Sequence, residues 1–178
     1  FDAKLHRSIA DLDPSLWQSC FGDSDPFLRW DFLYGLETSA CTTAESGWQP
    51  AHITLEQSGA PAGVLPAYLK THSYGEYVFD WSWADAWQRM GLRYYPKLVT
   101  AIPFTPATGR RLGDLTGDAG AIATMATCVK AMSEELEISS WHVLFLDEAT
   151  SQQLRSCEMP QRLTTQFHWF NRDYRDFQ

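Results

Sequence analysis

The sequence predicts a mixed α/β fold, and three stretches carry that prediction. Residues 51–56 alternate between apolar and polar side chains, as a strand with one buried face does. Apolar residues between 122 and 136 recur at spacings of three and four, which places them on one side of a helix. Residues 141–146 are almost continuously apolar, which is typical of a strand covered on both faces. With 178 residues, 44% of them hydrophobic, the chain is expected to form one domain with a substantial core.

The N-terminal part of the chain predicts an edge strand and two helices. Residues 4–10 have the pattern of the strand. Asp-Pro pairs at 13–14 and 25–26 each supply an N-cap and a proline for the first helical turn, so a helix is expected after each pair. The second helix is predicted to run to about Ser39, and residues 40–47 are expected to form a loop.

The middle of the chain predicts a β-hairpin followed by a helix. Residues 51–56 and 64–70 both have extended patterns, and the turn residues Gln-Ser-Gly-Ala-Pro at 57–61 lie between them. The second half of residues 77–90 is expected to be a helix that stops at Gly91.

The remaining elements follow from the same patterns. Residues 97–102 predict a strand that ends at Pro103, and the long helix is expected to begin after Asp118. A short helix is predicted over 149–156. Residues 163–170 alternate between apolar and polar side chains and predict a final strand.

Charge, hydropathy and cysteine spacing exclude several classes of protein. The formal net charge of −8 is unfavourable for binding a nucleic-acid backbone. No apolar run approaches the roughly 18 residues of a membrane span, and no secretory leader is visible. The cysteines lack metal-ligand spacing, so we expect no metal site, free and mostly buried thiols, and a reducing, cytoplasmic location. They are Cys20, Cys41, Cys128 and Cys157.

The loop at 102–112, which follows a predicted strand, is the first candidate site. Glycine lets backbone amides approach a ligand closely, while threonine hydroxyls and guanidinium groups suit phosphate oxygens. A pyrophosphate site is therefore one interpretation of the loop, and a rigid proline-rich turn with two solvated arginines is the other. The candidate binding residues are Thr105, Thr108, Gly109, Arg110 and Arg111.

The segment 72–85 is the second candidate site. It combines one imidazole, three carboxylates and several aromatic rings, a composition that shifts carboxylate pKa values by burial and supplies a proton acceptor. Glu76 and Asp80 would share a helix face if the segment is helical there. In the alternative interpretation His72 and Glu76 are surface residues and the tryptophans belong to the core.

These two segments also carry a resemblance to a known family. The words are "HSYGEYVFDWSWADAWQRMGLRYYPKL" and "PFTPATGRRL". They resemble a bacterial family of FemAB-like proteins, described as involved in peptidoglycan biosynthesis or recognition, which belongs to the acyl-CoA N-acyltransferase (GNAT) superfamily. The resemblance implies a GNAT-like fold with a central mixed sheet flanked by helices. It also implies that residues 1–178 are one GNAT-like domain, the N-terminal half of a longer two-half protein.

The resemblance assigns roles to the candidate residues. The loop residues Thr105, Thr108, Gly109, Arg110 and Arg111 would hold the pyrophosphate of an acyl-coenzyme A donor, and Glu76 and Asp80 would be catalytic. Contacts with the acceptor are expected from His72, Tyr74, Trp81, Trp83, Asp85 and Phe104. The sequence departs from the usual pattern because residues 112–119 separate the loop from its helix, and Asp114 and Asp118 compete with a phosphate there.

Two classes of function follow. In the first, the chain is an N-acyltransferase, or half of one, that moves an acyl or aminoacyl group to an amine, with Glu76 or Asp80 as the base. In the second, it is a non-catalytic module that recognises a peptide or glycan of peptidoglycan by aromatic stacking. A purely structural half is a third possibility. A transfer-RNA partner is expected only if the other half supplies basic contacts.

Overall fold

The computed structural model describes residues 1–118 and 120–176, which confirm a mixed α/β fold with the strands divided between two sheets. In the first sheet the strands are antiparallel and stand in the order β1, β3, β4, β7. Their bounds are Asp2–His6, His52–Gln57, Ala60–Leu65 and Gly113–Asp114. The predicted hairpin is confirmed, with Gly59 in a left-handed conformation at its turn.

The second sheet has the order β2, β5, β6, β8, and only its β6–β8 pair is parallel. Its strands are Gln49–Pro50, Ala67–Lys70, Lys97–Thr100 and Trp141–Val143. The predicted strand 64–70 is divided between the two sheets at Pro66, because proline has no N–H to continue a ladder. The predicted strand 141–146 is shorter than expected and half-buried.

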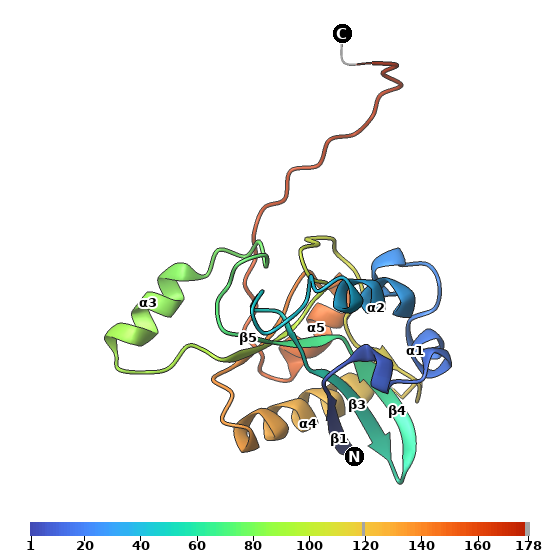
Figure 1. Ribbon diagram of the computed structural model, residues 1–178, viewed down its shortest axis with the longest axis vertical. Coiled ribbons are helices and arrows are strands. Elements are labelled where there is room, and N and C mark those ends of the chain that lie inside the picture. The colour runs from blue at the N-terminus through green and yellow to red at the C-terminus, as the bar shows by residue number, and fades with distance from the viewer. Residues whose placement is uncertain (119, 177–178) are drawn as a thin grey trace.

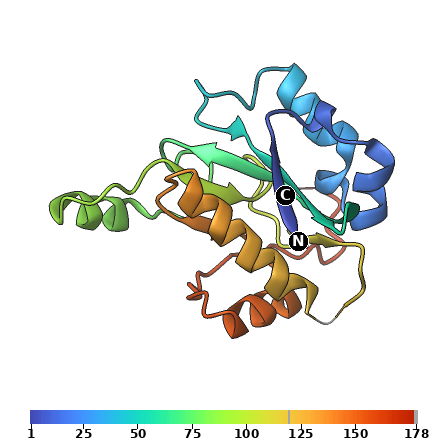
Figure 2. The same ribbon diagram turned by 90° about the horizontal axis from the view of Figure 1, so that it is seen from below.

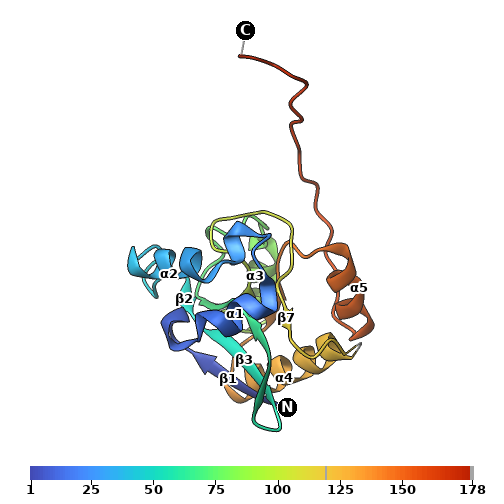
Figure 3. The same cartoon turned by 90° about the vertical axis from the view of Figure 1, so that its right-hand side faces the viewer.

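Helices cover both faces of this framework (Figures 1 and 2). The long helix α4 (Ala121–Glu135) and α5 (Glu148–Ser156) cover one face, where Met125 and Val129 pack with strand residues such as Ile53 and Leu98. On the other side α1 (Pro14–Phe21) and α2 (Trp30–Thr38) pack around Trp17. Figure 3 shows these two layers on either side of the strands.

The helix predicted to follow Asp25-Pro26 is interrupted. Residues Pro26–Leu28 form a short 3-10 helix, and Arg29 has an extended backbone with ψ 140° before α2 begins. The buried Leu28 side chain belongs to the core around Trp17, and the Leu28 carbonyl accepts a hydrogen bond from Trp17 Nε1 at 2.7 Å. The Asp13 N-cap of α1 is confirmed, since its Oδ1 accepts a hydrogen bond from Ser15 N at 2.8 Å.

Helix α3 (Trp81–Arg89) stands apart from the body of the molecule (Figure 1). It has no buried residue among those the structure describes, and the chain turns at Gly91, which has φ 72°. Trp81 and Trp83 are exposed. The alternative interpretation, in which the tryptophans of this segment belong to the core, is therefore wrong for these two residues.

The prediction of a final strand at 163–170 is wrong. The segment runs away from the body as an extended, exposed chain (Figures 1 and 3), and Phe167 is 97% exposed. Gln166 Nε2 donates a hydrogen bond to the Pro106 carbonyl at 2.6 Å, which connects the segment to the body. Alternation alone does not make a strand, because a strand also needs a partner edge for its backbone.

The four cysteines are free thiols, but only Cys20 is fully buried and Cys41 is exposed, which corrects the expectation that most are buried. Within residues 1–118 and 120–176, no group of three or more His, Cys, Asp or Glu side chains is placed to hold a metal ion. No helix in this described part has the length and apolar character needed to cross a membrane.

Candidate acceptor site at the β5–β6 pair

Two buried lysines define the candidate site. The antiparallel register of β5 and β6 places Lys70 directly opposite Lys97, and Tyr68 opposite Val99. Side chains alternate along a strand, so these four project from the same face of the second sheet, away from the α4 layer. Both lysine side chains are fully buried, which requires other groups to compensate their charges.

Lys97 is fully compensated by the segment that connects β5 to α3. Its Nζ donates to Ser73 Oγ at 2.9 Å, Glu76 Oε2 at 2.8 Å and Asp80 Oδ2 at 2.6 Å. An ammonium has three N–H donors, so every donor of Lys97 has an acceptor. Glu76 and Asp80 are therefore brought together by a shared lysine. They do not share a helix face, because Glu76 lies in a loop and Asp80 precedes α3.

The two carboxylates have different environments. Burial alone would raise the pKa of Asp80, but hydrogen bonds from Lys97 and from Tyr94 OH, the latter at 2.6 Å, lower it to about 2. Burial raises the pKa of Glu76, because Lys97 compensates it only in part and Asp80 adds a like charge nearby. Glu76 Oε1 and Asp80 Oδ1 are both buried and have no hydrogen-bond partner in the part of the chain that the structure describes. Glu76 is therefore the stronger base of the pair.

Lys70 is compensated much less well than its neighbour. Its Nζ donates one hydrogen bond, to the Tyr74 carbonyl at 3.0 Å, and lies 3.7 Å from the centroid of the Trp48 ring. Burial lowers the pKa of Lys70 to about 8, with Glu76 opposing that shift and Lys97 adding to it. The indole Nε1 of Trp48 is also buried, and no described residue is its hydrogen-bond partner.

His142 completes the face. It lies on β8 opposite Val99, its Nε2 is 2.9 Å from Ser140 Oγ, and its ring centroid is 6.0 Å from that of Tyr94. Burial, assisted by the charge of Lys97, lowers the pKa of His142 to about 4. The imidazole is therefore neutral at pH 7.

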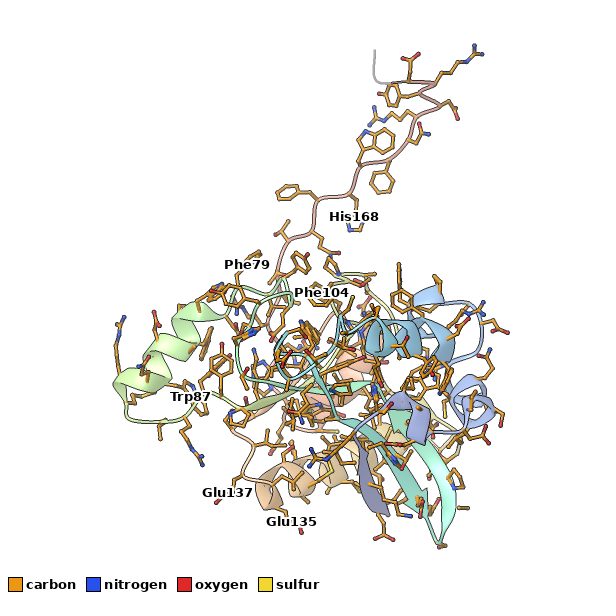
Figure 4. The ribbon with its side chains drawn as sticks, viewed as in Figure 1. Phe79, Trp87, Phe104, Glu135, Glu137 and His168 are labelled. Carbon is orange, nitrogen blue, oxygen red and sulfur yellow. The ribbon has the colours of Figure 1, made fainter. Side chains whose placement is uncertain are left out.

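The two segments singled out in the sequence meet above this face. Phe104 of the 102–112 loop packs against Gly75, where an added Cβ would lie 2.7 Å from the phenyl ring and 3.0 Å from Trp48 Nε1. Only glycine fits this approach, and its φ of 77° favours glycine as well. Phe79 and Phe104 both lie at this end of the molecule, whereas Trp87 lies farther along α3 (Figure 4).

A family model matches residues 8–178, and its description is peptidoglycan biosynthesis/recognition. The chain belongs to the FemAB-like family. The resemblance seen in the sequence is thereby confirmed, and it covers nearly the whole chain. A search of curated proteins finds no match to this FemAB-like chain.

One solved structure is similar in fold. It is the crystal structure, without ligand, of an aminoglycoside antibiotic 6′-N-acetyltransferase from Acinetobacter haemolyticus. The identity is 12% and the TM-score 0.51, and the match covers 97% of the FemAB-like chain and 100% of the other. At this identity the likeness concerns the fold, which is that of a GNAT acetyltransferase.

The structure places the predicted acceptor contacts of the FemAB-like chain in two groups. His72, Tyr74 and Trp81 form a row of edge-on rings, with centroids 5.1 and 4.8 Å apart, and Phe104 lies over Gly75. Trp83 and Asp85 lie on α3 with exposed side chains. The row and Phe104 thus border the buried cluster, while the second group borders solvent.

The predicted donor loop differs from a phosphate cradle. Arg111 is buried and donates to the carbonyls of Leu144, Arg110 and Ala107, so its guanidinium braces the loop from inside. Gly109 is tied to the segment between β8 and α5 by hydrogen bonds with Phe145 and Asp147. Thr105 is half-buried and donates its hydroxyl to the Pro103 carbonyl. Of the five predicted donor-loop residues, only Thr108 and Arg110 are exposed.

Acidic side chains lie beside the same loop and in the segment between the loop and α4. Asp25 Oδ2 lies against Gly109. Asp25 and Asp147 both favour the charged form of Arg111 and so oppose the lowering of its pKa by burial. At the start of α4, Asp118 accepts from Gly120 N at 3.2 Å, and Asp114 accepts from Thr116 N at 2.8 Å. Carboxylates here oppose a pyrophosphate. Three of the five predicted donor-loop residues are therefore used within the fold, and a pyrophosphate at this loop would depend on Thr108 and Arg110.

Sequence reasoning missed several residues of the cluster. Lys70 and Lys97 each stand at the end of an apolar strand, and a lysine in such a run is a signal of a compensated buried charge. His142 has no signal of its own beyond its place in a predicted strand. Trp48 and Tyr94 had no local signal, because only the tertiary fold brings them to the lysines.

Proposed function

We propose that this FemAB-like chain transfers an acyl or aminoacyl group to an amine of a peptidoglycan precursor. The family description supplies the biological context, and the acetyltransferase fold supports the type of reaction. We also propose that the chain acts as the first of two GNAT-like halves, as the family resemblance implies.

The observation that carries the proposal is the state of Glu76. Lys97 fixes one carboxylate oxygen, and the other, Oε1, is buried without a hydrogen-bond partner among the described residues. The pKa of Glu76 is raised by burial. A fixed carboxylate with an unused oxygen and increased basicity is what a general base requires.

The reaction requires one base and the correct orientation of the amine relative to the donor carbonyl. The amine nitrogen attacks the carbonyl carbon of a thioester or ester donor, so that a C–N bond forms and the carbonyl oxygen becomes an oxyanion. Glu76 Oε1 accepts the proton that the nitrogen loses. Collapse of the intermediate breaks the C–S or C–O bond, and the proton passes from Glu76 to the leaving thiolate or alkoxide.

The neighbouring groups position Glu76. Asp80 is too weak a base for this step, since its pKa is about 2, but it and Ser73 hold Lys97 in place. Tyr94 in turn holds Asp80. Because Glu76 is only 1% exposed, an acceptor reaches it only when a covering contact opens. We propose that this is the contact between Phe104 and Gly75, the residue that precedes Glu76.

The test is amide formation by the full protein with a defined acceptor. We would use the tripeptide L-alanyl-γ-D-glutamyl-meso-diaminopimelate, N-acetylated at alanine, with acetyl-coenzyme A and an aminoacyl-tRNA as alternative donors. Mass spectrometry should detect an acylated tripeptide with one of them. Glu76→Gln should reduce its rate of formation at least about tenfold, while Glu135→Gln, remote on α4 (Figure 4), should not. Product formation that is equal in all three proteins would refute the proposal.

A recognition module is the second candidate, favoured by the exposed rings of Tyr74, Phe79 and Trp83. Stacking of a sugar on these rings needs no base. In that case muropeptides should quench tryptophan fluorescence, Trp83→Phe should weaken the quenching, and Glu76→Gln should leave binding unchanged with no amide formed by any variant.

A further inference from the structure

The two opposed lysines differ in how many of their donors are used, and this difference points to a ligand group. Lys97 has three acceptors, whereas Lys70 has one among the described residues. Trp48 Nε1 adds a second buried donor without a partner, on the ring that carries Lys70. Buried donors left without acceptors are costly unless a ligand supplies them.

We propose that Lys70 and the indole Nε1 of Trp48 form a carboxylate-binding subsite, and that the acceptor amine carries a carboxylate on the same carbon. This inference rests on the proposed function and names the class of acceptor. The carboxylate oxygens receive the N–H donors of Lys70 and Trp48. The adjacent amine then faces Glu76 Oε1.

Charge balance favours an acceptor of this kind. The buried cluster contains two lysines and two carboxylates, Glu76 and Asp80, so its ionised groups sum to zero. A lone ammonium would add an uncompensated charge to this buried environment, which is unfavourable. An amino acid-like group brings one positive and one negative charge together and leaves the sum unchanged.

The groups around Lys70 and Trp48 disfavour the acceptor carboxylate at other positions in the cluster. Asp80, Glu76 and the Tyr74 carbonyl repel an anion, and every donor of Lys97 is already used. Trp48 is fully buried beneath Gly75 and Phe104, so a carboxylate reaches its Nε1 only when Phe104 moves aside. Phe104 is itself 42% exposed and is therefore able to move without opening the main core.

The experiment compares two acceptors that differ by this carboxylate alone. One is the N-acetylated diaminopimelate tripeptide named above, and the other is the same tripeptide with L-lysine in place of diaminopimelate. Calorimetric titration without any donor measures affinity independently of catalysis. The full protein should bind the diaminopimelate peptide at least about tenfold more tightly, as one charge-assisted hydrogen bond predicts.

Two variants locate the preference. Lys70→Met should abolish it by weakening only the diaminopimelate peptide, and Trp48→Phe, which keeps an aromatic ring under Lys70, should reduce it several-fold. Circular dichroism checks that both variants are folded. Equal affinities in the wild type, a preference that survives Lys70→Met, or no binding of the diaminopimelate peptide would each overturn the subsite. Equal affinities together with Glu76-dependent amide formation would overturn the subsite and leave the proposed function standing.

Discussion

Lys70 and Lys97 lie opposite each other on β5 and β6 and are equally buried. Lys97 donates to Ser73, Glu76 and Asp80, whereas within residues 1–118 and 120–176 Lys70 donates to the Tyr74 carbonyl alone. This difference separates a lysine that holds the site together from one that has donors for a ligand. The predictions below test that separation and the structure around it.

Lys97→Met should destabilise the protein strongly. Removing the shared cation leaves Glu76 and Asp80 buried without their counter-charge, which typically costs about 3–5 kcal/mol. Urea unfolding measures the loss. Lys4→Met removes the exposed ion pair with Glu56 and is the matched control, with an expected change below about 1 kcal/mol. Equal effects of the two substitutions would contradict the structural role of Lys97.

Arg111→Met and Arg110→Met should differ although the residues are adjacent. Arg111 is itself buried and donates to three carbonyls, so its loss should lower the unfolding free energy by at least about 2 kcal/mol. Arg110 is exposed, and its replacement should change stability by less than about 0.5 kcal/mol. A larger effect at Arg110 would show that the loop is braced differently.

Phe104→Ala should open the site to small reagents. Lys70 is buried in the wild type, and its pKa of about 8 leaves much of it neutral and nucleophilic at pH 8.5 once it is reachable. Acetylation by N-hydroxysuccinimide acetate, followed by peptide mass spectrometry, measures its reactivity relative to the surface residue Lys130. The ratio should rise several-fold in the variant. An unchanged ratio would mean that Phe104 does not shield Lys70 from the reagent.

Acid should destabilise the protein partly through Glu37. Burial alone would raise its pKa, but hydrogen bonds from His52, Ser8 and the Ile9 amide hold it below the ordinary value of 4.5. A carboxylate with a depressed pKa stabilises the fold above its ordinary pKa, and this contribution is lost as the pH falls through the folded value. Stability measured by urea unfolding should therefore fall below pH 4.5.

Glu37→Gln isolates that contribution. The variant should have a lower free energy of unfolding than the wild type at pH 6. This difference in unfolding free energy should become smaller as the pH falls from 4.5 toward 3, because protonated Glu37 resembles the amide of glutamine. A gap that stays constant over this range would assign the acid sensitivity to other carboxylates.

The elements that local patterns specify are predicted well from the sequence. Proline and capping aspartate fix the start of α1, and the turn at Gly59 fixes the β3–β4 hairpin. The errors arise where tertiary contacts decide. Pro66 divides one predicted strand between two sheets, and residues 163–170 have the alternation of a strand without a partner edge.

The candidate site shows the same division. The sequence identified Glu76 and Asp80 as an acidic pair near aromatic residues, but the lysines that hold or neighbour them come from strands on either side of that segment. Arg111 has the composition of a phosphate ligand, yet carbonyls of the folded chain use its donors. Residue type indicates what a side chain is able to bind, and only the fold determines whether its donors are already used.

The rate of amide formation in a single turnover, measured against pH for the wild type and Glu76→Gln, tests the central claim most directly. If Glu76 accepts the amine proton, the wild-type rate falls on acidification with a midpoint above 4.5, the ordinary value for glutamate. Glu76→Gln is then at least about tenfold slower and lacks that dependence. Equal rates with the same pH dependence in both proteins would remove Glu76 from the reaction.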